Sequence, residues 1–210
     1  MKTLPEKLKG IIDNQILYGS FGTNQSLLNG RMGLSLFFFH CSRFLHNRFY
    51  EDFAGELLED ICMHLPFDLA VDFADGLCGI GWAVEYMGRQ GFIEGDTDEI
   101  LEEIDAKIME RDLRRTTDTS FEHGLEGIVS YVRARLDSPG RESDKLPFDT
   151  DYLEDLKNAC QRTGVDWQSE DYIPETVWKR VVDWWQQAAA TTEVYSWKHG
   201  ILLLETHQNM

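Results

Sequence analysis

The pattern that decides the fold first occurs in residues 28–37, which read LNGRMGLSLF. Two glycines, Gly30 and Gly33, lie three residues apart, and a run of apolar side chains follows them. The pattern returns as ADGLCGIGWA in residues 74–83, EHGLEGIVSY in residues 122–131 and KHGILLLE in residues 198–205. In the last copy, Leu203 stands where the others have their second glycine. Several copies of one motif indicate a protein built from structural repeats.

The spacing of the copies gives the size of one repeat. Gly30, Gly76 and Gly124 are 46 and 48 residues apart, which leaves room for two helices of ~15 residues with their loops. Each repeat is therefore predicted to be a helical hairpin. Gly200 follows Gly124 by 76 residues, so this interval carries an insertion, which we place in the polar stretch 137–145.

Apolar periodicity predicts helices along the whole chain. The segment after each motif is strongly apolar, as expected of a buried inner helix. The segments between the motifs are amphipathic at helical spacing, with apolar positions 53, 57, 58 and 61, then 100, 101, 104 and 108, then 177, 178, 181, 182 and 185. No long stretch alternates with period two, so little or no sheet is expected. We predict an all-α fold of helical hairpin repeats in a single α/α domain, residues 1–210.

The paired glycines need a physical reason, because glycine inside a helix costs ~1 kcal/mol relative to alanine. Residues i and i+3 share one face of a helix. Two glycines at these positions leave that face bare, and we expect a neighbouring backbone to approach it closely.

The chain is strongly acidic, with a formal net charge of −17 over 210 residues. Such a charge repels phosphate backbones and attracts cationic peptides, so nucleic-acid binding is not expected. The most apolar stretch, residues 34–39, is far shorter than the ~20 residues that a membrane helix needs. Residues 1–7 do not resemble a signal peptide. We expect a soluble cytoplasmic protein that does not bind membranes.

The cysteines do not form a zinc motif. There are four, and none belongs to a C-x-x-C pair: Cys41, Cys62, Cys78 and Cys160. We expect buried free thiols, as is usual in a reducing cytosol, and no resident cofactor.

The repeats resemble those of the lanthionine synthetase C-like family. The similarity is carried by residues 26–38, SLLNGRMGLSLFF, and residues 75–86, DGLCGIGWAVEY, and it extends over residues 19–205. The resemblance implies an α/α toroid, with inner and outer helices and Gly-rich loops that converge at one end. The four motifs imply a partial ring or an open crescent.

The resemblance also implies where a zinc site would be. Active family members hold zinc with two cysteines and one histidine, and the zinc activates a peptide thiol for thioether formation. The Cys-His-Gly motif of the family is similar to Lys198-His199-Gly200, where only the histidine matches. The other cysteine loop is similar to residues 121–124, FEHG, which also lack cysteine. A protonated lysine cannot replace a thiolate ligand, so we expect a member that does not cyclise peptides.

The residues that flank the first glycines form the candidate binding rim. Asn29, Asp75, His123 and His199 would lie at equivalent points if the repeats superpose, and Glu122 and Lys198 are next to two of them. We expect helix-capping or solvent-facing roles for these residues and contacts with a partner. The alternative is a zinc site made of Asp75, His123 and His199. No catalytic residue is assigned.

Several functions are compatible with the sequence. The preferred one is a non-cyclising protein that binds a peptide or protein partner and is an accessory to peptide modification. One alternative is a divergent metal-dependent enzyme of the thioether cyclase type. Another is a glycoside-active α/α-toroid protein that uses carboxylates such as Asp72, Asp75 and Glu85. A partial ring would also leave apolar hairpin ends exposed, which favours a homodimer. The sequence does not decide whether the protein is an enzyme.

Overall fold

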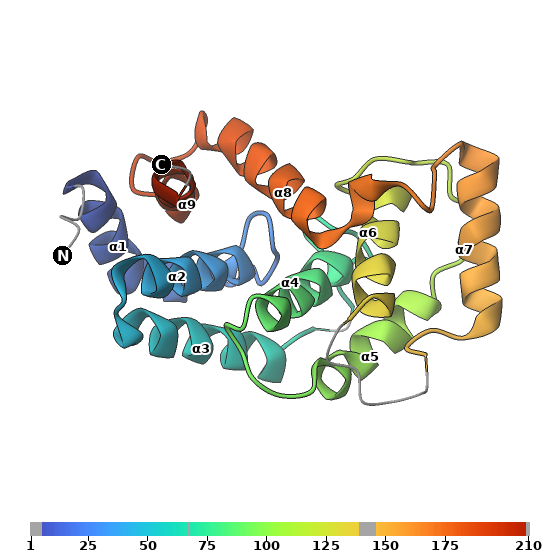
Figure 1. Cartoon of the computed structure of the whole chain (residues 1–210), viewed down its shortest axis with the longest axis horizontal. Coiled ribbons are helices and arrows are strands. Elements are labelled where there is room, and N and C mark those ends of the chain that lie inside the picture. The colour runs from blue at the N-terminus through green and yellow to red at the C-terminus, as the bar shows by residue number, and fades with distance from the viewer. Residues whose placement is uncertain (1–5, 67, 139–145, 209–210) are drawn as a thin grey trace. The chain divides into compact units, whose positions relative to one another are not determined.

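The fold is entirely helical in the part of the chain that the structure describes. Figure 1 shows this structure, a computed structural model that describes residues 6–66, 68–138 and 146–208. These residues form nine α-helices and two short 3-10 helices, with no strand. The predicted all-α class is therefore confirmed, whereas the partial ring stays a prediction.

The helices follow one another along the chain with short connections. In order they are α1 (Glu6–Tyr18), η1 (Gly19–Phe21), α2 (Arg31–Leu45), α3 (Arg48–Met63), α4 (Leu77–Arg89), α5 (Thr97–Met109), α6 (Leu125–Leu136), α7 (Thr150–Thr163), η2 (Glu170–Tyr172), α8 (Pro174–Ala189) and α9 (Trp197–Gln208). Helices α2, α4 and α6 each begin directly after the first glycine of a motif, as predicted. Helices α3, α5 and α8 coincide with the three amphipathic segments.

One helix was not predicted. Helix α7 occupies part of the interval in which we expected an insertion, and Asp149 caps it by accepting a hydrogen bond from the Tyr152 N–H at 2.6 Å. Its buried residues have helical spacing, Tyr152, Leu156, Ala159 and Cys160. The apolar periodicity of these residues could therefore have predicted this helix. Of the insertion predicted at 137–145, residues 139–145 lie outside the described residues.

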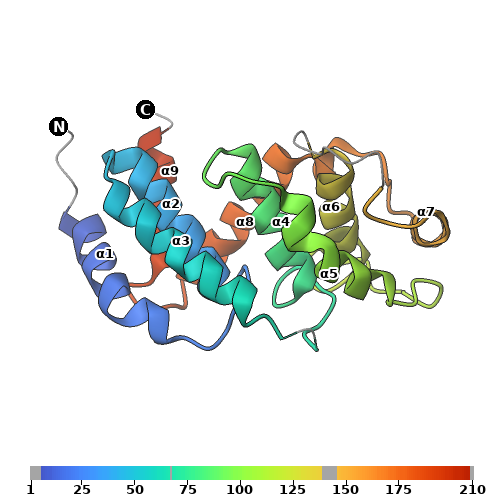
Figure 2. The ribbon, with the colours of Figure 1, turned by 90° about the horizontal axis from the view of Figure 1, so that it is seen from below.

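The chain divides into two compact units, which are described separately. Unit 1 consists of residues 1–64 and 178–210, and unit 2 of residues 65–177. The single domain predicted for residues 1–210 stays a prediction. In unit 1, α2 lies between α3 and α9 in both views (Figures 1 and 2). Its side chains are buried along nearly the whole helix, including Phe37 and Phe38, as expected of an inner helix.

Unit 2 has a similar inner pair, α4 and α6, and a charged cluster within its core. Figures 1 and 2 place α6 between α4 and α7. Arg135 of α6 is only 1% exposed and pairs with three carboxylates. Its Nη1 atom lies 2.7 Å from both Glu85 and Asp98, and its Nη2 atom lies 2.6 Å from Asp105. Tyr131 donates a hydrogen bond to Asp105 at 2.5 Å. These pairs connect α4, α5 and α6.

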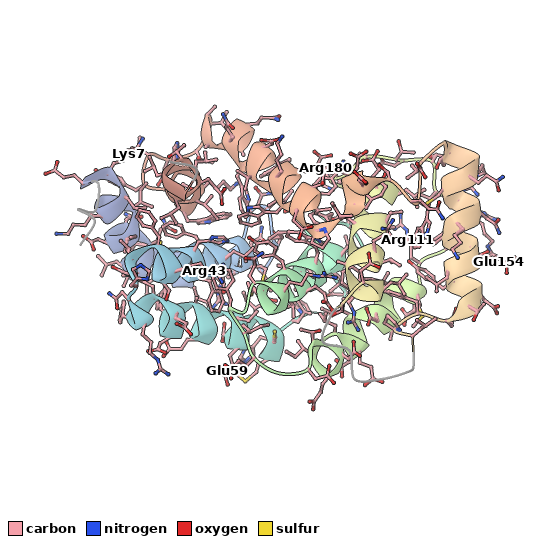
Figure 3. All side chains as sticks on the ribbon, in the orientation of Figure 1. Lys7, Arg43, Glu59, Arg111, Glu154 and Arg180 are labelled. Atoms are coloured by element: carbon pink, nitrogen blue, oxygen red, sulfur yellow. The ribbon has the colours of Figure 1, made fainter. Side chains whose placement is uncertain are left out.

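Most charged side chains lie on the outer surface of the helices. Lys7, Glu59 and Glu154, labelled in Figure 3, are exposed and point away from the helices that carry them. In the described part of the chain, no helix combines the length and the apolar character that crossing a membrane would require.

Candidate functional site

Three loops that precede inner helices have the same backbone structure. We call residues 24–30, 70–76 and 118–124 Gly-motif loops 1, 2 and 3. Each ends in a glycine that is the N-cap of the next helix, with extended backbone angles and no side-chain cap. In each loop the first N–H of the helix donates to a carbonyl seven residues earlier, at 2.9 Å, from residue 31 to 24, 77 to 70 and 125 to 118. The first three copies of the motif thus share one loop structure.

The first glycine is needed because the loop folds back against it. A Cβ atom on Gly30 would lie 2.5 Å from the Asn24 carbonyl oxygen, and one on Gly76 would overlap the Ala70 carbonyl oxygen. The second glycine, represented by Gly33, similarly leaves room for the Leu27 carbonyl oxygen. The predicted close approach of a neighbouring backbone is therefore confirmed at Gly33, whereas the prediction that both glycines share one helix face was wrong. The close approach is within the loop itself, and the first glycine precedes the helix.

The positions before these glycines are not helix caps. Since Gly30, Gly76 and Gly124 are the N-caps, the preceding residues lie one position outside each helix. Those residues, Asn29, Asp75 and His123, are exposed. The capping role expected for them was wrong, and the solvent-facing alternative agrees with their exposure.

The fourth motif does not form a loop of this kind. Lys198, His199 and Gly200 lie in the first turn of α9, which begins at Trp197. A Cβ atom on Gly200 would overlap the ring of Phe37 in α2, so this glycine allows α9 to pack on α2. His199 is therefore not equivalent to the residues that precede the N-cap glycines.

In unit 1, loop 1 and α9 are connected by a buried lysine. The Lys198 Nζ atom donates to the Asn29 Oδ1 atom at 2.9 Å, although the two residues are far apart in sequence. Lys198 is 6% exposed, and its ammonium group lies 5.0 Å from the ring centroid of Trp184 and 5.7 Å from that of Trp197. Aromatic faces stabilise a cation at this distance. His199 is half-buried, and its Nδ1 atom has no hydrogen-bond partner among the described residues.

In unit 2, loops 2 and 3 lie side by side. The N–H groups of Phe73 and Ala74 donate to the Glu122 carbonyl oxygen at 3.0 and 2.9 Å. This pairing brings the His123 Nδ1 atom within 3.4 Å of the Asp72 Oδ2 atom. The Oδ1 atom of Asp72 accepts the Asp75 N–H at 2.8 Å. Asp75, Glu122 and His123 therefore gather around Asp72, whereas Asn29, Lys198 and His199 form a separate group in unit 1.

The residues at the implied zinc positions do not fit a zinc site with two thiolates. Lys198 offers an ammonium group, which has no lone pair for a metal, and residues 121–124 contain no cysteine. Within residues 6–66, 68–138 and 146–208, no three His, Cys, Asp or Glu side chains are grouped so that they could hold a metal ion.

The four cysteines are free in the structure. Burial raises the pKa of the Cys41 and Cys78 thiols well above the usual range, and that of Cys160 to about 11. These three thiols are therefore protonated near neutral pH. Cys62 is exposed, so the expectation of buried thiols was wrong for this residue.

One of the candidate carboxylates for sugar chemistry belongs to the core. Glu85 is 1% exposed, and its carboxylate is held by Arg135 at 2.7 Å. It also accepts a hydrogen bond from Thr97 at 3.2 Å. A carboxylate with these partners stabilises unit 2 and does not face a substrate.

Two features of unit 1 were not found from the sequence. One is a pocket of about 110 Å³ at the start of α2, lined by residues that include Asn24, Asn29, Arg31 and Trp197. The other is a set of exposed apolar side chains, Leu17, Tyr18, Phe21, Val194 and Tyr195, which we call the apolar surface of unit 1. Gln15 connects the two segments of this surface by donating to the Tyr195 carbonyl oxygen at 2.9 Å. Neither feature could be recognised without the long-range contacts.

Comparison with known proteins identifies a family. The sequence model of the family described as lanthionine synthetase C-like protein matches residues 22–191. This range contains the three Gly-motif loops and ends before Lys198. No curated protein and no solved structure matches the chain.

Proposed function

The chain belongs to the lanthionine synthetase C-like family, and from this premise we propose that it binds a peptide or protein partner without forming thioether rings. In this proposal the Gly-motif loops and the apolar surface of unit 1 contact the partner. The protein acts as an accessory to peptide modification in the cytoplasm. Its four cysteines are free, which supports a location in a reducing compartment.

The observation that carries the proposal is the environment of Lys198. This residue stands where the family resemblance implies a zinc-binding cysteine, and its ammonium group is held by Asn29 and two tryptophan rings. Burying a charge is costly unless it is paired or hydrogen-bonded, and the partners of Lys198 satisfy this condition. The surroundings of Lys198 therefore accommodate its ammonium group. The positive charge of that group would repel a second cation such as zinc beside it.

The exposed apolar surface supports a macromolecular partner. Phe21 is 79% exposed and Tyr18 is 65% exposed, and aromatic side chains are enriched where proteins bind one another. The net charge of −17 favours a cationic partner. A second copy of the chain is the alternative occupant of this surface.

The contact between Asp72 and His123 favours a second candidate, a divergent metal-dependent enzyme. A carboxylate that accepts a hydrogen bond from histidine fixes the orientation of the ring, and metal-binding histidines commonly have such a partner. The ligands that the sequence suggested for this candidate, Asp75, His123 and His199, are not grouped into a metal site in the described part of the chain. The glycoside-active alternative has less support, because the Glu85 carboxylate is buried and paired with Arg135.

We expect the protein to prefer cationic peptides in a manner that depends on salt. Two peptides of equal length and aromatic content, one with lysines and one with glutamates, both amidated at the C-terminus, would be compared by fluorescence anisotropy. The cationic peptide should bind more tightly, and its affinity should fall as the ionic strength rises, because salt screens the attraction. A Phe21→Ser variant should weaken binding, whereas Phe49→Ser, at an exposed position of α3, should not. Equal affinity for both peptides at all salt concentrations would contradict the proposal.

A further inference from the structure

We propose that Asn29 is a site of self-modification, at which Lys198 promotes the conversion of the side-chain amide into a carboxylate. Asn29 is the only asparagine of the chain that is followed by glycine. A glycine in this place has no side chain to hinder the attack of its own backbone nitrogen on the preceding amide carbon. Asn29 is exposed, so water reaches it. The hydrogen bond from Lys198 to the amide oxygen is a further feature that the sequence pattern alone does not contain.

The reaction needs water as its only other reactant. The Gly30 backbone nitrogen loses its proton and attacks the Asn29 Cγ atom, and the new bond between them closes a succinimide ring. The bond from Cγ to the side-chain nitrogen breaks, and that nitrogen takes up the proton and leaves as ammonia. Water then adds to one ring carbonyl and opens the ring. Residue 29 becomes aspartate or isoaspartate, so the net change is the exchange of ammonia for water.

Lys198 lies where it can assist the attack on the amide carbon. Its Nζ atom donates to the Asn29 Oδ1 atom at 2.9 Å, and this oxygen gains negative charge when the carbon is attacked. A preorganised cationic donor stabilises such a charge, as an oxyanion hole does. Burial of Lys198 and the rings of Trp184 and Trp197 hold the ammonium group in place. Because these rings favour the protonated form, Lys198 acts as a donor and not as the nucleophile.

The nucleophile is not engaged elsewhere. Within residues 6–66, 68–138 and 146–208, the Gly30 N–H donates no hydrogen bond, whereas the next N–H, that of Arg31, donates to the Asn24 carbonyl oxygen at 2.9 Å. No hydrogen bond of Gly30 must therefore break before its nitrogen attacks.

Two other asparagines of unit 1 lack this combination and are internal controls. The Asn24 Oδ1 atom accepts the Ser26 N–H at 2.9 Å, and the Asn47 Oδ1 atom accepts the Phe49 N–H at 3.1 Å. These donors are neutral, and neutral donors form weaker hydrogen bonds than an ammonium group does. The residues that follow are glutamine and arginine, whose side chains hinder the attack. We therefore expect both asparagines to persist when Asn29 reacts.

The loop can accommodate a carboxylate at residue 29. Gly-motif loop 2 has Asp75 at the equivalent position, directly before its N-cap glycine. A carboxylate would give the Lys198 ammonium group a charged acceptor in place of a neutral one, and charge-assisted hydrogen bonds are the stronger kind. It would also make the rim more acidic, which favours a cationic partner. This last consequence rests on the proposed function, whereas the modification itself does not.

Mass spectrometry of the incubated protein tests the proposal. Wild-type protein would be kept in a mildly basic buffer made with water enriched in heavy oxygen, which labels each modification that occurs during the incubation. Peptide mapping then locates the label. We expect labelled aspartate or isoaspartate at residue 29, and unchanged Asn24 and Asn47.

Two lysine variants show whether the folded structure promotes the reaction. Lys198→Met removes the cationic donor and should slow the modification of the folded protein by about tenfold or more. Lys7→Met removes the same charge from an exposed position on α1 and should leave the rate unchanged. In denaturant, all three proteins should react at one rate, which should be slower than that of native wild type. This comparison decides the question if Lys198→Met does not fold.

Several results would overturn the proposal. One is that Asn29 stays unmodified in native wild type, or reacts no faster than Asn24 and Asn47. Another is that folded Lys198→Met reacts as wild type does, or that native wild type reacts no faster than the unfolded chain. Loss of ammonia with a covalent bond between residues 29 and 198 would also overturn it, because the lysine would then be the nucleophile. None of these measurements uses a partner, so their failure would leave the proposed function untouched.

Discussion

Replacement of Arg135 by methionine is expected to lower the free energy of unfolding by about 3–5 kcal/mol, the usual cost of leaving buried charges unpaired. Arg135 is 1% exposed, and its side chain fills space between Glu85 and Asp105. Methionine fills part of the same volume but cannot neutralise these carboxylates. Denaturant unfolding followed by circular dichroism would measure the change.

The control for Arg135 is the exposed ion pair of the same unit. Arg114 lies 2.9 Å from Asp112, and both side chains are largely exposed, so Arg114→Met should leave stability essentially unchanged. Adding Asp105→Asn to Arg135→Met should restore part of the lost stability, because one unpaired charge is removed. If Arg135→Met unfolds at the same denaturant concentration as wild type, the buried ion network has no stabilising role.

Replacement of Gly76 by alanine is expected to be destabilising by about 3 kcal/mol, at the upper end of the usual range for overpacking. The added Cβ atom would overlap the Ala70 carbonyl oxygen and lie 2.7 Å from the Asp72 N atom. Both neighbours are backbone atoms, which cannot move aside without opening Gly-motif loop 2. The melting temperature of the variant would show the effect.

A matched glycine without these contacts provides the comparison. A Cβ atom on Gly55, within α3, would meet nothing within 4 Å. Gly55→Ala should therefore raise stability by about 0.5–1 kcal/mol, since alanine is the better helix former. A Gly76→Ala variant as stable as wild type would mean that the loop does not require glycine.

The repeat spacing was sufficient to predict where the inner helices begin. Helices α2, α4 and α6 start at Arg31, Leu77 and Leu125, directly after the first glycine of each motif. This succeeded because each loop is closed by local hydrogen bonds within seven residues. The fourth motif is similar in sequence but lies inside α9. Its glycine allows α9 to pack on α2 and does not close a loop.

The side-chain contacts of the site could not be predicted in the same way. Lys198 and Asn29 are separated by 169 residues, and no local pattern indicates their hydrogen bond. Arg135 likewise meets Glu85 across 50 residues. The sequence identified rim positions from their place in the motifs, but it could not show which of them meet or which are buried.

The measurement that tests the central claim most directly is the metal content of the native protein, purified without chelators. Inductively coupled plasma mass spectrometry would compare wild type with His123→Ala and His199→Ala. If the protein is a non-cyclising binder in which Lys198 has taken a ligand position, zinc should be far below stoichiometric in all three. About one zinc ion per chain in wild type, lost in both variants, would contradict the proposal and support the metal-dependent enzyme.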